Sequence, residues 1–90
     1  MKMWNEYQET TELMNELNNA EVEFEVREHG KVFVNITNDS DELEGIYSIK
    51  YEPYWHAYKV IWYFLDSNNQ IRGEKTIAFS IEQILENILA

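Results

Sequence analysis

The chain has 90 residues, of which 17 are acidic and 7 basic, giving a formal net charge of −10, and it contains no cysteine. This length is typical of one domain, so we expect a single domain over residues 1–90; without cysteine, disulfides, thiolate zinc sites and thiol nucleophiles are excluded. A surface this acidic repels nucleic acid and anionic membranes and attracts basic proteins. The expected partner is therefore a basic, nucleic-acid-binding protein, with no direct binding to nucleic acid or to a membrane.

Apolar residues recur at helical spacing over Trp4–Asn19, which predicts an amphipathic helix. Its apolar side is formed by Tyr7, Met14 and Leu17, with Trp4 and Leu13 at the edges. Its opposite side carries a row of glutamates, Glu9, Glu12 and Glu16. The N-terminal residues lack the apolar stretch of a secretory signal, and no apolar run approaches the roughly 20 residues of a membrane span, so a cytoplasmic protein is expected.

Strict alternation of apolar and acidic residues over Glu21–Arg27 predicts a half-buried strand. On its solvent-facing side, alternate residues of this strand lie about 6.6–6.8 Å apart. The three glutamates there, Glu21, Glu23 and Glu25, would therefore form a straight acidic row about 13 Å long. The next strand is Lys31–Thr37, and matching the apolar faces favours a three-residue loop, Glu28–Gly30, over a two-residue turn. This loop pairs Val26 with Val32, Phe24 with Val34 and Val22 with Ile36.

The rest of the sequence predicts an acidic connector, three strands and a helix. The connector, Asn38–Gly45, carries Asp39, Asp41, Glu42 and Glu44. The expected strands are Ile46–Tyr51, ended by Pro53, then Tyr54–Leu65 and Ile71–Ala78, joined by a turn over Asp66–Gln70. Ser80 and Gln83 form a capping box that starts the final helix, whose apolar stripe contains Ile81, Ile84, Leu85, Ile88 and Leu89.

This order predicts an α+β fold: a single domain with an antiparallel meander sheet of four to five strands, flanked by an N-terminal and a C-terminal helix (α-β-β-β-β-β-α). The strand Tyr54–Leu65 is apolar on both faces and is expected in the centre of the sheet. Two helices most naturally cover one face. The other face would then expose Phe33, Ile61, Tyr63 and Leu65, which is more apolar surface than a monomer usually shows.

No catalytic or metal-binding constellation is apparent. His29 and His56 have no second histidine at helical or strand spacing. The acidic connector fails the EF-hand pattern, because Leu43 and Glu44 stand where a ligand and a glycine are needed, and the glycines are too scattered for a phosphate loop. We therefore expect no enzymatic activity, no metal and no cofactor. The aromatic residues from Tyr47 to Tyr58 are interpreted as cross-strand core pairs. Binding of a small ligand by these residues is the least favoured of the functions considered.

Two functions from different classes remain. The favoured one is a small inhibitor that occludes the basic nucleic-acid site of an enzyme, acting as a nucleic-acid mimic through its glutamate rows and acidic connector. In charge and size alone the chain is similar to anti-CRISPR proteins and to immunity proteins of nucleases. The alternative is a structural or accessory protein of a phage or mobile element that homodimerises through the exposed aromatic sheet face.

Overall fold

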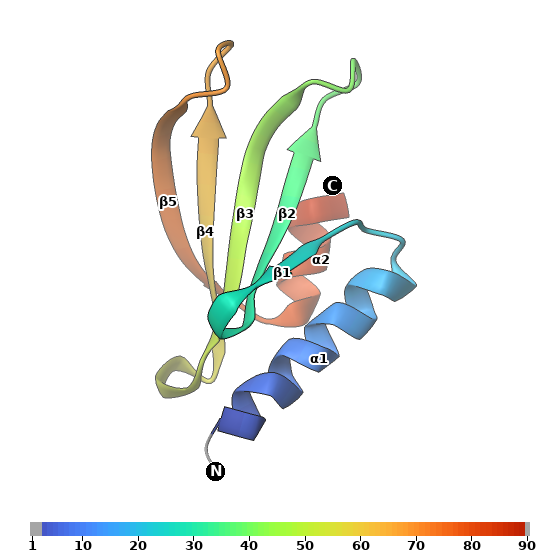
Figure 1. The fold of residues 1–90 in the computed structure, drawn as a ribbon, viewed down its shortest axis with the longest axis vertical. Helices are drawn as coiled ribbons and strands as arrows, with labels where there is room; N and C mark the ends of the chain where they lie inside the picture. Colours follow the sequence, from blue (N-terminus) through green and yellow to red (C-terminus); the bar gives the residue numbers. More distant parts are fainter. Residues whose placement is uncertain (1–2, 90) are drawn as a thin grey trace.

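The computed structural model describes residues 3–89, which form two helices and a five-stranded antiparallel sheet (Figure 1). In chain order the elements are α1 (Met3–Asn19), β1 (Glu25–Arg27), β2 (Lys31–Thr37), β3 (Leu43–Glu52), β4 (Ala57–Leu65), β5 (Ile71–Phe79) and α2 (Ile81–Leu89). The strands pair in the order β1-β2-β3-β4-β5, so each contacts only its neighbours in the chain. The predicted α+β meander with flanking helices is confirmed.

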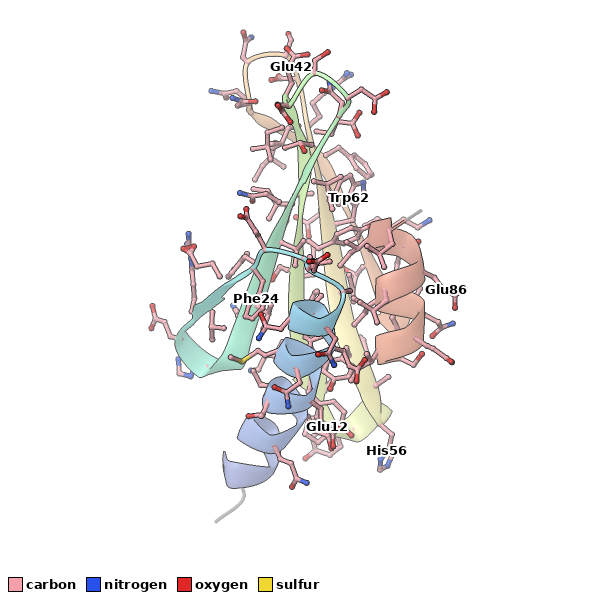
Figure 2. All side chains as sticks on the ribbon, turned by 90° about the vertical axis from the view of Figure 1, so that its right-hand side faces the viewer. Glu12, Phe24, Glu42, His56, Trp62 and Glu86 are labelled. Atoms are coloured by element: carbon pink, nitrogen blue, oxygen red, sulfur yellow. The ribbon has the colours of Figure 1, made fainter. Side chains whose placement is uncertain are left out.

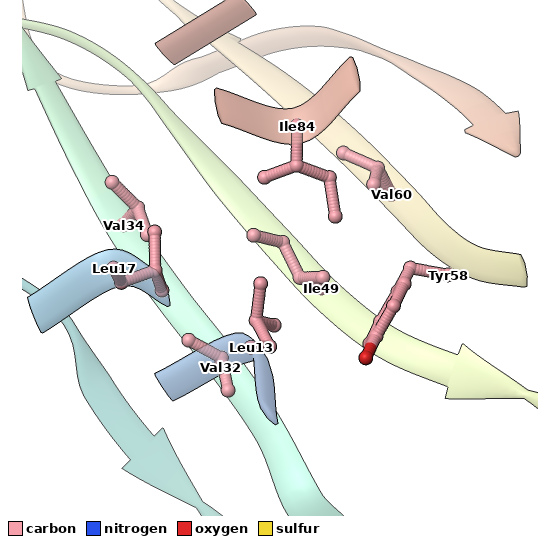
Figure 3. Close-up of a cluster of buried hydrophobic side chains, with 8 residues drawn as sticks. All are labelled: Leu13, Leu17, Val32, Val34, Ile49, Tyr58, Val60 and Ile84. Carbon is pink, nitrogen blue, oxygen red and sulfur yellow. The ribbon is translucent and has the colours of Figure 1, made fainter. Parts of the chain in front are cut away.

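Both helices cover the same face of the sheet, and the core lies between the two layers (Figures 1 and 3). Val32 stands opposite Ile49, and Ile49 opposite Val60, so one line of aliphatic side chains crosses three strands. The remaining buried members of this core are Leu13 and Leu17 of α1, Val34, Tyr58 and Ile84 of α2. Full burial of an aliphatic side chain contributes roughly 1.5–3 kcal/mol, so this cluster is the main source of stability.

Helix α1 packs through a face rotated from the predicted one. Leu13 and Leu17 are at most 1% exposed and Thr10 is 7% exposed, whereas Met14 is only half-buried. The Tyr58 hydroxyl donates a hydrogen bond of 2.7 Å to the backbone carbonyl oxygen of Glu9, which fixes the helix against β4. The apolar positions expected at Trp4 and Tyr7 lie outside the described side chains.

A Schellman motif ends α1 and shortens the strand that was predicted over Glu21–Arg27. The Val22 N–H donates to the carbonyl of Leu17 (2.9 Å), and the Glu21 N–H donates to the carbonyl of Asn18 (3.0 Å). Residues 22–24 then approach the sheet without strand pairing, so β1 contains only Glu25–Arg27. The longer strand is therefore wrong, and of the expected pairs only Val26 with Val32 forms.

The turns between the strands are determined by residues with special backbone conformations. The predicted three-residue loop Glu28–Gly30 is confirmed, with Gly30 at φ 70°. The strand expected from Tyr54 begins instead at Ala57, because Pro53 starts a 3-10 turn that closes on His56 at φ 50°. The capping box of α2 is confirmed as well.

In that capping box the Ser80 N–H donates to Gln83 Oε1 at 2.9 Å, and the Gln83 N–H donates to Ser80 Oγ at 3.3 Å. These two bonds satisfy donors that have no partner inside the helix. They fix the point at which the chain leaves β5 and turns back over the sheet.

Replacing Glu21 with glycine is expected to raise the free energy of unfolding by about 0.5–1 kcal/mol, because glycine relieves a left-handed backbone at φ 59°. Urea denaturation measures the change. Glu16→Gly is the matched control, since the same substitution within α1 should lower the free energy of unfolding by a similar amount. A loss of stability in Glu21→Gly would contradict the Schellman assignment.

Gly45→Ala is expected to destabilise the fold by about 1–3 kcal/mol through overpacking. An added Cβ would collide with Cη2 and Cζ2 of the Trp62 indole and lie 2.6 Å from the Tyr63 carbonyl oxygen. Thermal unfolding, followed by tryptophan fluorescence, measures the loss. Gly73→Ala is the control: there the closest atom would lie 3.3 Å away, on Phe64, and equal losses in the two variants would argue against this packing.

Candidate functional site

In the described part of the molecule, lysine and arginine are confined to the sheet layer, whereas acidic residues occur in both layers. Among the described side chains of the helices, the exposed acids are Glu12, Glu16, Glu82 and Glu86, and Glu9 is half-buried beside them. Residues 3–19 and 81–89 contain no lysine or arginine, while all six basic residues within 3–89 lie on strands. Figure 2 looks onto this acidic helix layer, with Glu12 on α1 and Glu86 on α2 labelled.

A groove of about 540 Å³ runs between the two helices and the end of the β3–β4 hairpin. Its charged walls are Glu9 and Glu16 from α1 and Glu82 from α2, and Tyr51 and Tyr58 also line it. The two tyrosine rings meet edge to face, with centroids 5.2 Å apart. Burial, followed by the negative charges of Glu9 and Glu12, raises the pKa of Tyr58. The groove is thus a negative site that favours a positively charged side chain.

The acids expected as a row along the first strand do not form one. Glu21 belongs to the end of α1, Glu23 lies in the unpaired crossing, and only Glu25 is in β1. Arg27 binds Glu25, donating from Nε at 3.1 Å and from Nη2 at 3.0 Å. Glu21 and Glu23 remain exposed and line one hollow with Asn18, so they extend the acidic surface of α1.

The connector predicted over Asn38–Gly45 is too long, because residues 43–45 belong to β3; residues 38–42 form the tip of the β2–β3 hairpin. Asn38 shapes it by accepting the N–H groups of Ser40 and Glu42 at 2.8 and 3.0 Å. The structure adds Asp66 of the β4–β5 turn, which lines one hollow of about 480 Å³ with Glu42 and Glu44. We call this group the acidic tip; its members are Asp39, Asp41, Glu42, Glu44 and Asp66.

Sequence reasoning did not group Asp66 with the connector, although in a meander every second turn lies at the same end of the sheet. Backbone N–H groups of Gln70 and Asn68, followed by the charge of Arg72, lower the pKa of Asp66. Its carboxylate therefore stays ionised and keeps the turn closed. The acidic tip is a negative feature built from two hairpins.

The sheet face opposite the helices, here called the open face, carries an apolar patch among polar side chains that include Asn35, Ser48 and Thr76. Phe33, Ile46 and Tyr63 line a hollow of about 830 Å³ with Ile71, which is 61% exposed. Ile61 lies on the same face, opposite Ser48 and Thr76. Leu65, also expected there, lines the hollow at the acidic tip.

A line of cations crosses the open face, and sequence reasoning missed it. Arg27 stands opposite Lys31, and Lys50 opposite Lys59; the neighbouring pair Val32–Ile49 places Lys31 beside Lys50. We call these four residues the basic row. Adjacent members are on strands about 4.7–4.9 Å apart. Only the register reveals the row, because its members are scattered over 33 positions of the chain, from 27 to 59.

The members of the basic row differ in their partners. Arg27 is paired with Glu25 and its guanidinium lies 4.9 Å from the centre of the Phe33 ring. Lys31, Lys50 and Lys59 make no ion pair with any residue that the structure describes. Like charges directly opposite on a sheet are destabilising. Repulsion within the basic row therefore lowers the stability of the isolated chain.

The remaining candidates are structural. His29 and His56 are exposed turn residues with positive φ. Tyr51 packs on Tyr58 and Tyr47 on Trp62, as cross-strand pairs on the helix side of the sheet. Within residues 3–89 there is no group of acidic or histidine side chains arranged to hold a metal, and no helix there is long and apolar enough to cross a membrane.

No protein-family model matches the chain, and no curated protein or solved structure shows significant similarity to it.

Proposed function

We propose that this protein is a small inhibitor that docks its acidic helix layer into the basic, nucleic-acid-binding site of an enzyme. The observation that carries the proposal is the absence of lysine and arginine from residues 3–19 and 81–89, where both helices present glutamates. The groove between the helices is walled by Glu9, Glu16 and Glu82, and His56 also lines it. Arginine or lysine side chains of a partner would enter this groove. A nuclease or another nucleic-acid-processing enzyme of the cytoplasm supplies such a surface.

The spacing of the acids indicates how far the mimicry of nucleic acid extends. Along α1, Glu9, Glu12 and Glu16 rise by steps of about 4.5 and 6 Å, compared with about 3.4 Å per phosphate on one DNA strand. The helix layer therefore imitates the sign and layout of a phosphate backbone at lower density. Its advantage is that the helix backbone fixes the spacing of these residues, which limits reorganisation on binding.

The net charge of −10 supports rapid association with such a partner. Electrostatic steering raises association rates, and its effect falls with ionic strength. The protein as proposed acts by occupying a site and carries out no reaction itself. Inhibitors of the anti-CRISPR or nuclease-immunity type act in this physical way.

The triple variant Glu9→Gln, Glu16→Gln, Glu82→Gln should lose at least ten-fold in affinity for its partner while remaining folded, because it removes the charged walls of the groove. The measurement is capture by immobilised protein from a nuclease-treated lysate at low salt, followed by elution with duplex DNA and mass spectrometry. Nucleic-acid-binding enzymes that elute with DNA, and are lost from the variant, are the expected result.

The matched control is Glu28→Gln, Glu52→Gln, Glu74→Gln, which removes the same charge from positions outside both helices. It should capture the same proteins as the unmodified chain. If both variants lose the partner equally, net charge and not the helix layer is responsible. If neither variant loses it, the acidic helix layer is not the binding site.

A further inference from the structure

We infer that the open face is the interface for a second copy of this chain, packed antiparallel so that the basic row of each copy lies on the acidic tip of the other. This inference is independent of the proposed inhibitor function, which uses the opposite side of the molecule. It rests on three observations: an uncovered apolar patch, three lysines that form no ion pair with any described residue, and the positions of both charged groups along the strands.

The centre of the interface is apolar. Phe33, Ile46, Ile61 and Tyr63 are only half-buried, and Ile71 at the edge is 61% exposed. No described element covers them, because α1 and α2 both lie on the other face. Two sheets that pack face to face lie about 10 Å apart, with their side chains interdigitated. The hollow of about 830 Å³ in this face provides room for side chains of the second copy.

The basic row supplies the reason for a charged partner. Lys50 and Lys59 are half-buried, face each other across adjacent strands, and lack an ion pair among the described residues. This arrangement costs free energy in the isolated chain. An anionic group placed on the row would remove that cost.

Along the strands, the acidic tip and the basic row lie at similar distances from the middle of the open face, on opposite sides of it. A two-fold axis over the middle of the face would therefore exchange their positions. Ile46 and Tyr63 stand opposite each other on β3 and β4. Lys50 lies four residues from Ile46 on one side and Glu42 four residues on the other, so each is about 13 Å away along an extended chain.

The same relation holds on β4. Lys59 precedes Tyr63 by four residues, and Asp66 follows it by three. A two-fold axis that runs between the copies, over this pair and across the strands, therefore brings the acidic tip of one copy to the same position along the strands as the basic row of the other. Figure 2 shows Glu42 at one end of the sheet and His56 towards the other.

A second copy fits this face better than nucleic acid does. Phosphates drawn to the three lysines would meet the acidic tip on the same sheet and a chain of net charge −10. A second copy supplies anions at the required distance and an apolar surface for the centre. In such an isologous dimer both acidic helix layers point outward.

The test is the mass in solution, measured by analytical ultracentrifugation over a dilution series from 1 µM to 1 mM. The unmodified chain should form a dimer that weakens as salt rises. Lys50→Glu with Lys59→Glu should weaken the dimer at least ten-fold, and so should Glu42→Lys with Glu44→Lys. The chain that combines all four substitutions keeps the original net charge and should dimerise again, because the ionic contacts are restored with reversed sign.

Glu82→Lys with Glu86→Lys is the control, since it makes the same change of charge on the helix layer and should leave the dimer intact. Circular dichroism confirms folding, and Lys50→Gln with Lys59→Gln replaces any reversal that fails to fold. A chain that stays monomeric at 1 mM and low salt overturns the inference. So does a four-fold variant that remains monomeric, or a monomer whose lysines instead retain a single-stranded oligonucleotide in a gel-shift experiment.

Discussion

Strand register is the constraint on which the rest of this structure depends. Pairing Val32 with Ile49, and Ile49 with Val60, aligns the aliphatic side chains that both helices cover. Because side chains alternate across a sheet, the same register fixes the order of everything on the other face. A slip of one residue would bury the lysines under the helices and expose the core, so core and basic row are specified together.

This coupling explains what sequence reasoning could and could not reach. Periodicity and capping signals identified both helices, an antiparallel meander and the three-residue loop, since each depends on residues close together in the chain. The order of the strands in the sheet was left open. The signals failed at Glu21, where the backbone bonds that close α1 outweigh the alternation pattern. They failed again at Tyr54–His56, where the restricted φ of proline favours a turn over a strand that looks continuous by composition.

The candidate surfaces show the same limit. The acids of α1 were readable from the sequence because helical spacing is local, and the apolar open face followed from strand alternation. The acidic tip was only half recognised, since Asp66 joins it through the topology of the meander. The basic row was missed altogether, because it requires the register of three strand pairs at once. Surfaces assembled from several strands are thus the candidate sites that are hardest to predict from a single sequence.

The strand order has a further consequence for how the chain reaches this structure. Every strand pairs with its neighbour in the chain through a short connection, so the loop-closure entropy of each pairing is small. The sheet therefore has a low contact order for a β-rich domain, a property that goes with fast folding. The hydrogen bond from Tyr58 to Glu9 is different, because it joins positions 49 residues apart. Docking of α1 on β4 is consequently the step with the largest entropic cost. During synthesis of the chain, α1 can form this hydrogen bond only after β4 has been made.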